Sequence, residues 1–342
     1  MKRDKIKPFY NTQRETLGDV LPLDTPFTVI IDTSEVCNFK CNYCFRAHPE
    51  VANETYAKKE GLMKWDTFIK TVEQIKQFPK QVKRIALSGQ GEPMCNKLLP
   101  DMIKYIKKSG LLGKTEIHTN ASFLSDKKFA YDLADSGIDK VIISLQGLNS
   151  EMYQRTCDVA IDFDKFYNGI KTFYKRKKNT NVNIKIADVA LRHGEEETFY
   201  QMFDGVSDRL YIEKIVPLFI GVDYTDIRKS NDKYINKYGV TFGDLKCCNP
   251  IYYTLCITPK GMINPCAQLE PPIVMGNIHN TTLIEAWNSK TRIDFLKQDL
   301  TQGHKKNNKC NKCYLPYNSV KVEKDLIDNY SENILTRLIS LK

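Results

Sequence analysis

Short apolar runs alternate with segments of helical periodicity along the first two thirds of the chain. The apolar runs have the length of buried strands and cover residues 27–33, 84–88, 115–119, 140–145, 183–189 and 210–216. Amphipathic segments that predict helices separate them, at residues 63–77, 98–108, 126–136, 164–176 and 195–203. This alternation predicts an α/β fold with a parallel sheet and crossover helices. Six such units fit an open, partial (β/α)6 barrel of the TIM type, whose site lies at the carboxyl ends of the strands.

The alternation stops after Pro217, and the rest of the chain divides by composition. Residues 221–246 are polar and mixed, which is typical of a bridging segment. Cysteines return from Cys247 onward, around a predicted β-hairpin (257–266) and a helix (283–287). We therefore expect an N-terminal extension, a barrel, a bridge, a second domain built of a hairpin and a helix, and a C-terminal helix, over residues 1–26, 27–220, 221–246, 247–318 and 319–342.

Composition narrows the class of protein. The chain has 342 residues, of which 42% are hydrophobic, so it can build one large core or two smaller ones. Residues 1–10 are lysine-rich and lack the apolar segment of a secretory signal, and no apolar run reaches the length of a membrane span. These features predict a cytoplasmic protein with no membrane association. Its eleven cysteines are then better interpreted as metal ligands than as disulfides.

The net charge of +10 comes mainly from scattered lysines. A solvated lysine-rich surface explains it, and so would attraction of an anionic partner such as a nucleotide-sugar, a flavodoxin or RNA. Because no stripe of interleaved basic and aromatic residues is present, binding of nucleic acid is not expected.

Three cysteines lie close together directly after the first apolar run. Cys37, Cys41 and Cys44 are spaced x3 and then x2. Three thiolates at this spacing can hold three irons of a cubane cluster and leave the fourth iron open, whereas ferredoxins usually close all four positions with cysteine. A zinc site with His48 as the fourth ligand is the alternative.

The Cys37-x3-Cys41-x2-Cys44 motif, with the aromatic Tyr43 before its last cysteine, resembles the signature of the radical S-adenosylmethionine (SAM) enzymes. The resemblance implies a [4Fe–4S] cluster whose open iron binds SAM, with Tyr43 at the cofactor site. One electron from the cluster cleaves SAM in that family, and the resulting 5′-deoxyadenosyl radical takes a hydrogen atom from the substrate.

Four later motifs match further SAM-binding positions of that family. Taken alone, each is an ordinary turn or surface residue. Ser88-Gly-Gln-Gly-Glu-Pro93 resembles the family's Gly-Gly-Glu-Pro motif, which implies that Gly91 and Glu92 meet the SAM amino group. The resemblance also implies that Asn120 shapes the SAM site, that Ser144 contacts SAM and that Arg155 binds its carboxylate.

A second cysteine set follows in the C-terminal third. Cys248, Cys266 and the pair Cys310-x2-Cys313 would suit a zinc ribbon or an iron–sulfur cluster equally well by spacing. Next to a radical SAM motif the set resembles the SPASM extension in its shorter, twitch form, which implies one auxiliary [4Fe–4S] cluster on these four residues. Cys247 competes with Cys248 as the first ligand. Cys256 lies between the ligands, either as a residue of the hairpin core or as a hydrogen-atom donor to the substrate.

The resemblance leaves several reactions open. The favoured one is a radical SAM oxidoreductase that oxidises, epimerises or dehydrates a carbohydrate or aminocyclitol, with a flavodoxin or ferredoxin as electron donor. Alcohol oxidation needs a general base, and residues on late strands are candidates: Lys185, Asp188, Glu213, Lys214 and, on the third strand, His118. The alternatives are peptide modification, such as thioether formation or residue oxidation, and a metal-binding protein that has lost catalysis.

Overall fold

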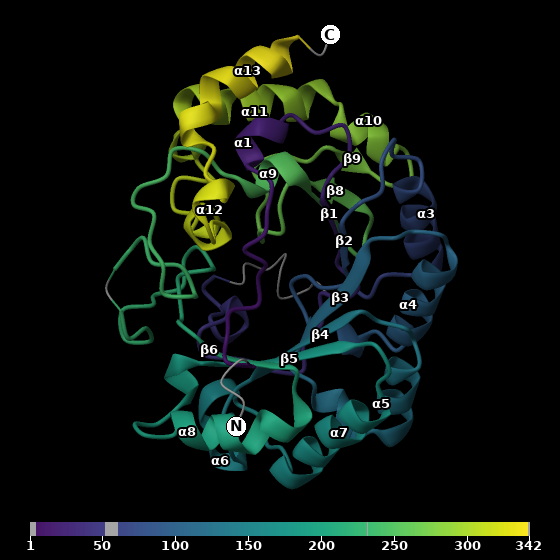
Figure 1. The fold of residues 1–342 in the computed structure, drawn as a ribbon, viewed down its shortest axis with the longest axis vertical. Coiled ribbons are helices and arrows are strands. Elements are labelled where there is room, and N and C mark those ends of the chain that lie inside the picture. Colours follow the sequence, from purple (N-terminus) through teal and green to yellow (C-terminus); the bar gives the residue numbers. More distant parts are fainter. Residues whose placement is uncertain (1–4, 52–60, 231, 341–342) are drawn as a thin grey trace.

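The barrel is built on one continuous sheet of nine strands, in the order β6-β5-β4-β3-β2-β1-β7-β8-β9. The computed structural model describes residues 5–51, 61–230 and 232–340. All six predicted strands are present and pair in parallel with their neighbours. They are β1 (Thr28–Ile31), β2 (Arg84–Ala86), β3 (Lys114–Thr119), β4 (Lys140–Leu145), β5 (Asn181–Ala187) and β6 (Arg209–Glu213). The sheet curves into a partial barrel (Figure 1), which confirms the predicted fold class.

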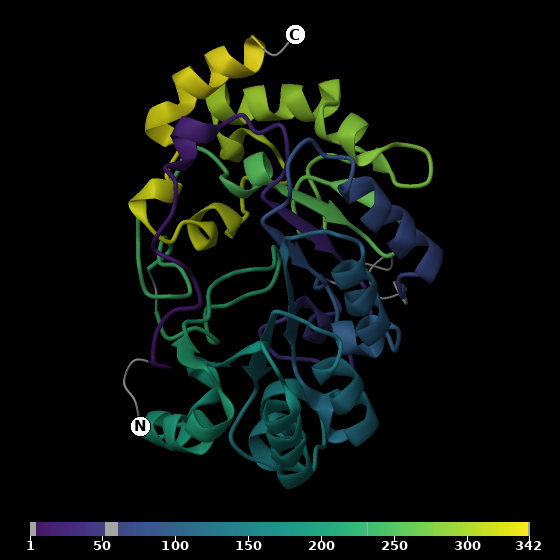
Figure 2. The ribbon, with the colours of Figure 1, turned by 45° about the vertical axis from the view of Figure 1, so that its right-hand side comes forward.

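Helices cover the outer face of the curved sheet, as Figures 1 and 2 show. The five predicted helices are α3 (Trp65–Ile75), α4 (Leu99–Lys108), α5 (Lys127–Ala134), α7 (Phe163–Arg176) and α8 (Glu196–Phe203). Phe68 of α3 and Phe173 of α7 are buried in the same cluster as Ile117 and Ile143 of the strands. The helix α6 (Ser150–Cys157) was not predicted; Asn149 caps its first turn by accepting a hydrogen bond from the Met152 N–H.

The inner face of the sheet is polar, because side chains alternate between the two faces along each strand. In β5, Val182, Ile184 and Ile186 belong to the outer core, so Asn183 and Lys185 point into the barrel. Lys185 is the register partner of Ser144 on β4, so these two side chains share the inner face. The barrel therefore encloses hydrogen-bonding and charged groups.

The C-terminal region joins the barrel sheet instead of forming a hairpin apart from it. Strand β7 (Thr254–Ile257) pairs in parallel with β1, and β8 (Met262–Asn264) and β9 (Gly276–Asn277) follow in antiparallel order. All four residues of β7 are buried, which fits a strand in the middle of a sheet. The helices α9 (Pro250–Tyr253), α10 (Leu283–Trp287) and α11 (Lys290–Gln302) complete this region, so the predicted hairpin and helix are present.

The C-terminal helix is shorter than expected. Residues 319–342 were predicted as one helix, but α12 (Leu315–Ser319) ends early and α13 spans only Ser331–Ile339. Between them the Asp325 carboxylate accepts hydrogen bonds from the Lys321 and Val322 N–H groups, which holds the chain in a turn. Arg337 of α13 donates to the Asp19 carbonyl, so α13 packs beside α1 (Leu17–Val20), while the described chain begins at the opposite end of the molecule (Figure 1).

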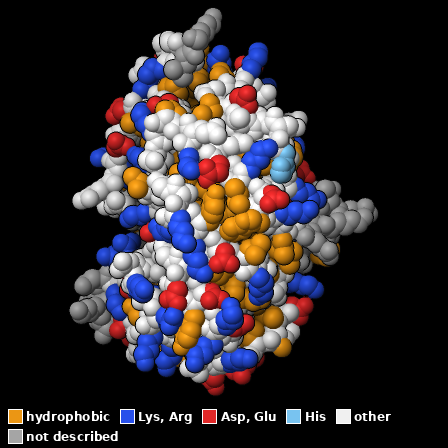
Figure 3. Space-filling view, turned by 90° about the vertical axis from the view of Figure 1, so that its right-hand side faces the viewer, with side chains coloured by type: hydrophobic (Ala, Val, Ile, Leu, Met, Phe, Trp, Pro, Cys, Tyr) orange, Lys and Arg blue, Asp and Glu red, His pale blue; other side chains and the backbone are white. Residues whose placement is uncertain are grey.

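The surface over α3, α4 and α5 carries charges of both signs. Figure 3 shows Lys and Arg side chains interspersed with Asp and Glu on this face, which agrees with a solvated, lysine-rich surface there. No helix among the described residues is long and apolar enough to cross a membrane.

Candidate active site and auxiliary cysteine site

The loop with the first three cysteines lies against the end of α6. The Lys40 and Asn42 N–H groups donate to the carbonyls of Cys157 and Thr156, at 3.0 and 2.8 Å. Phe39 is buried in the main core, so the loop is held on both sides. Cys37, Cys41 and Cys44 are free, partly exposed thiols on this loop. Helix α6, absent from the predictions, therefore positions the triad.

The donor set of this loop fits an iron–sulfur cluster better than zinc. Both His48 ring nitrogens are engaged, Nε2 with the Asn42 carbonyl at 2.7 Å and Nδ1 with Glu50 at 3.2 Å, so His48 is not placed as a fourth ligand. Across the described residues, no three His, Cys, Asp or Glu side chains are grouped as ligands of a single metal ion. In a cubane cluster each thiolate binds a different iron, which spreads the ligands apart. Burial raises the pKa of the Cys37 and Cys44 thiols to about 12, and bound iron would favour their thiolates.

The predicted glycine motif packs directly beneath the cysteine loop. A Cβ atom on Gly91 would lie 2.3 Å from the Ser34 carbonyl oxygen and 2.4 Å from that of Val36. The next N–H, of Glu92, donates to the same Val36 carbonyl at 2.8 Å. Only glycine permits this close approach. Gly91 therefore lets the loop after β2 pack against the backbone that leads into Cys37.

The Glu92 carboxylate is hydrogen-bonded to other groups of the protein. Its buried carboxylate accepts hydrogen bonds from Thr119 Oγ1 at 2.6 Å, Asn120 N–H at 2.7 Å and Met94 N–H at 3.0 Å. Burial raises the pKa of Glu92 to about 7, against the lowering effect of these donors. In the structure Glu92 ties the loops after β2 and β3 together, while its contact with the SAM amino group stays a prediction.

Asn120 and Tyr43 connect the cysteine loop to neighbouring strands. The Asn120 side-chain amide donates to Asn38 Oδ1 at 2.9 Å, and Asn38 lies between the first two cysteines. The Tyr43 hydroxyl donates to Gln146 after β4, and Tyr43 is half-buried. Both residues therefore connect the cysteine loop to the ends of β3 and β4, while their contribution to the SAM site stays a prediction.

Ser144 lies on β4 and Arg155 on α6, and their contacts with SAM stay predictions. Ser144 is half-buried on the inner face, next to Lys185. Arg155 is exposed, and its guanidinium contacts Met152 Sδ at 3.2 Å. A guanidinium in this setting can pair with a carboxylate such as that of SAM.

The candidate bases on late strands separate into two groups. Lys185 and Glu213 form a buried ion pair at 2.6 Å, and Lys237 from the bridge pairs with the other Glu213 oxygen at 2.9 Å. Asp188 instead accepts the Ile215 N–H at 3.1 Å and holds the chain after β6. Lys214 donates its N–H to the Lys237 carbonyl, which brings the bridge to the barrel. Lys237 was missed because nothing distinguishes one lysine in a polar segment.

His118 belongs to a separate charge network. Its Nε2 lies 3.6 Å from Glu116, which also pairs with Arg84 at 3.0 Å and Lys140 at 3.6 Å. Burial would raise the pKa of Glu116, but these cations hold it well below its usual range. His118 is thus oriented by Glu116, as a satisfied histidine.

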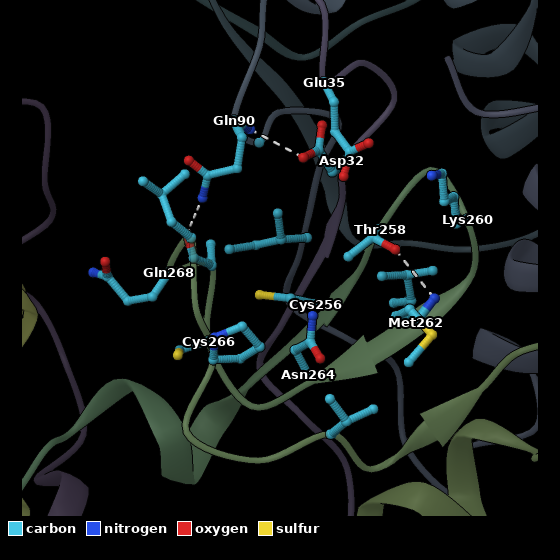
Figure 4. A pocket seen from close by; sticks show the side chains of 17 residues that line it. Asp32, Glu35, Gln90, Cys256, Thr258, Lys260, Met262, Asn264, Cys266 and Gln268 are labelled. Atoms are coloured by element: carbon cyan, nitrogen blue, oxygen red, sulfur yellow. Dashed lines mark hydrogen bonds between the residues drawn. The ribbon is translucent and has the colours of Figure 1, made fainter. Parts of the chain in front are cut away.

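A cavity of about 220 Å³ lies between the ends of β1 and β2 and the β7–β8 hairpin (Figure 4). Asp32 lines it and accepts hydrogen bonds from the Ser34 N–H at 3.2 Å and the Gln90 N–H at 3.0 Å. Burial raises the pKa of Asp32 to about 7. Cys256 lines the same cavity from β7, so its thiol faces the cavity and not only the hairpin core. Asp32 was not among the predicted site residues, because a lone carboxylate after a strand carries no motif.

The second cysteine set converges at one small cavity. Its lining includes the thiols of the four predicted ligands: Cys248, Cys266, Cys310 and Cys313. Burial, reinforced by the neighbouring thiols, raises the pKa of Cys310 to about 12. Cys247 points elsewhere, since its Sγ contacts the Asp299 carbonyl at 3.7 Å. The geometry therefore groups Cys248, and not Cys247, with the other three, and four thiols suit a fully ligated cluster.

Comparison with known proteins agrees with both cysteine sites. The family model of the radical SAM superfamily matches residues 31–203, about half of the chain. The SPASM model, described as an iron–sulfur cluster-binding domain, matches residues 247–314.

Curated relatives match only over part of their length. A tungsten-containing aldehyde ferredoxin oxidoreductase cofactor-modifying protein of Pyrococcus furiosus is 34% identical over 119 residues, covering 34% of this chain and 30% of the relative. A probable GTP 3′,8-cyclase of Methanococcus maripaludis is 38% identical over 119 residues (35% and 36%), and the GTP 3′,8-cyclase of Brucella ovis is 29% identical over 170 residues (47% and 44%). The chain thus spans less than half the length of these relatives.

Solved structures share the fold over most of the chain. SuiB of Streptococcus suis bound to S-adenosylmethionine has a TM-score of 0.62 at 18% identity, covering 92% of this chain and 79% of that chain. The structure of anSMEcpe with bound AdoMet has a TM-score of 0.58 at 17% identity, covering 92% of this chain and 98% of that chain. BtrN in complex with AdoMet and 2-DOIA has a TM-score of 0.51 at 18% identity, covering 84% of this chain and 92% of that chain. At these identities the likeness concerns the fold.

Proposed function

This chain belongs to the radical SAM superfamily, and from this premise we propose that it removes a hydrogen atom from a carbohydrate or aminocyclitol. The outcome would be oxidation, epimerisation or dehydration. The observation that carries the proposal is the cavity to which Asp32, Gln90 and Cys256 contribute polar groups among largely apolar neighbours. Its volume of about 220 Å³ suits a ring-sized molecule, whose apolar ring faces would meet the apolar lining while its hydroxyl groups meet Asp32 and Gln90.

The cofactors have defined places in this proposal. Cys37, Cys41 and Cys44 would hold the SAM-binding [4Fe–4S] cluster, and Cys248, Cys266, Cys310 and Cys313 an auxiliary one. When bound, the first cluster and SAM supply an electron and a 5′-deoxyadenosyl radical that abstracts hydrogen. An electron donor of the flavodoxin or ferredoxin type would be needed to reduce the protein.

The chain's own residues would handle the proton and position the substrate. Asp32 is suited to accept a hydroxyl proton, because a general base works best when its pKa is near the working pH. Cys256, whose thiol lines the same cavity, is placed to return a hydrogen atom to a substrate radical. Gln90 has its backbone held by Asp32 and its side-chain amide by the Ala267 carbonyl, so it closes one wall.

Hydrogen transfer from a labelled substrate tests the proposal. The reconstituted, dithionite-reduced protein would be incubated with SAM and deuterated sugars, aminocyclitols or peptides, and deuterium would be sought in 5′-deoxyadenosine. We expect transfer from a sugar or aminocyclitol, and none with a Cys37/Cys41/Cys44→Ala variant. Transfer from peptides alone would replace the proposal by peptide modification.

A further inference from the structure

A cluster of basic side chains surrounds one carboxylate inside the barrel; we call Lys185, Lys237, Lys321 and Glu213 the basic cluster. Lys185 and Lys237 each pair with one oxygen of Glu213, at 2.6 and 2.9 Å. The Lys237 and Lys321 ammonium groups lie 5.0 and 4.9 Å from the centre of the same ring, that of Tyr238. Burial would raise the pKa of Glu213, but the two paired lysines hold it at about 2, so it is ionised. Three lysine side chains are therefore grouped around one ionised carboxylate.

A second carboxylate near the basic cluster, that of Asp325, does not neutralise its positive charge. Asp325 lies near Lys321 but is paired with Arg14 at 2.5 Å. Unpaired positive charge inside a protein is costly unless an anion or solvent compensates it. Burial also lowers the pKa of Lys185 and Lys321, and a bound anion would reverse this by favouring their charged forms.

The inner face near the basic cluster is partly open to solvent and holds unused hydrogen-bonding capacity. Asn183 lies two residues before Lys185 on the same face of β5 and is fully buried. Neither its amide nitrogen nor its amide oxygen has a hydrogen-bond partner among the described residues. His118 keeps 40% of its side chain exposed although β2 and β4 flank its strand, so the inner face is open to solvent. The Asn183 amide is enclosed, so it marks unmet hydrogen-bonding capacity behind the basic cluster, and a ligand would approach from the solvent-accessible side next to His118.

We propose that the basic cluster binds an oxyanion of the substrate, a phosphate or a carboxylate group. This inference rests on the proposed function and narrows its substrate to an anionic sugar derivative. Lysine ammonium groups act as compact charges toward phosphate, and a cleft of one sign concentrates anionic ligands. Lys185 is also the register partner of Ser144, the predicted SAM contact, so the bound anion would lie on the β4–β5 side of the cofactor. No residue of the basic cluster lines the cavity beside Asp32, so the anionic group would be the part of the substrate that extends beyond that cavity.

Calorimetry on the reconstituted protein with SAM tests the site, with inorganic phosphate and acetate as probes and glycerol as the neutral control. We expect one anion to bind, about tenfold more weakly in Lys237→Gln, with recovery in Lys237→Arg. Glu213→Gln should bind it more tightly, because the variant removes the competing negative charge; a purely structural role predicts no such gain. The matched control is Lys177→Gln, an equally buried lysine outside the barrel that pairs with Asp208 at 3.0 Å.

The results separate the two anions and the two proposals. Binding of phosphate assigns a phosphorylated substrate, and binding of acetate a carboxylated one. Binding of neither, or equal binding by wild type and Lys237→Gln, overturns the basic cluster as a ligand site. Anion binding without hydrogen transfer from any sugar would keep the site and refute the proposed function. Transfer from neutral sugars without anion binding would refute the site alone.

Discussion

Replacing Gly91 by alanine should displace the cysteine loop relative to the ends of the barrel strands. The added Cβ would lie 2.3 Å from the Ser34 carbonyl oxygen, whereas real contacts essentially never fall below 3.0 Å, so the two must separate by about 0.7 Å. The neighbouring Val36 oxygen, at 2.4 Å, requires a similar shift. Both atoms are backbone, so no flexible side chain can yield. Because Cys37 directly follows Val36, the displacement of Val36 should also move Cys37.

The expected consequences follow from the size of that shift. Overpacking of this kind costs about 1–3 kcal/mol in stability. A displacement near 1 Å at a reacting group can cost about 100-fold in rate, so activity should fall far more than stability. Two [4Fe–4S] clusters hold about eight irons, and the variant should lose about four of them.

Iron and sulfide counting after anaerobic reconstitution, followed by the rate of 5′-deoxyadenosine formation with dithionite, measures these effects. Gly205→Ala is the control, because its Cβ would meet nothing within 4 Å. Wild-type iron content and rate in Gly91→Ala would refute the reasoning, as would equal losses in both variants.

Three further predictions address other parts of the site. Cys248→Ala should lose the auxiliary cluster and about four irons, while Cys247→Ala keeps them. The reverse result in iron counting would show that Cys247, whose thiol contacts Asp299, is the ligand. Arg155→Ala should weaken SAM binding about tenfold or more in calorimetry, because a charge-assisted pair is lost, whereas Arg192→Ala, which removes an exposed pair with Glu151, should not. Stability should fall as pH rises from about 4 to 7, because folded Asp32, with its pKa near 7, keeps a proton that the unfolded chain has released. Thermal unfolding across this range should show a smaller fall in Asp32→Asn, and identical slopes would rule Asp32 out as the cause.

The sequence predicts the barrel well because its strands and helices are long enough to show their periodicity. The boundaries of α4 and β4 agree with the prediction to within one residue. Strand β7 pairs with β1 rather than standing alone in a hairpin, and a buried strand of four residues cannot reveal its pairing partner. The prediction of one helix over residues 319–342 was wrong because hydrogen bonds to Asp325 interrupt it.

The residues of the candidate site also divide into those that the sequence identifies and those that only the fold brings together. The first cysteine triad and the loop glycine are recognisable because their spacing is local, and the second cysteine set is recognisable through its resemblance to the SPASM extension. Asp32, Asn183 and Lys237 carry no local signal, since their significance arises from neighbours that are distant in sequence. Glu92 was predicted as a SAM contact, and its three protein donors could be known only from the folded arrangement of β2 and β3.

The pairing of β1 with β7 also has a consequence for how the protein is made. Thr28 pairs with Thr254, so β1 leaves the ribosome long before its second neighbour is synthesised. Throughout that interval the hydrogen-bonding edge of β1 is uncovered, and an uncovered parallel edge is a template for joining another chain. The C-terminal cysteine region therefore seals the nascent barrel, and a chain terminated before residue 254 is expected to aggregate through β1.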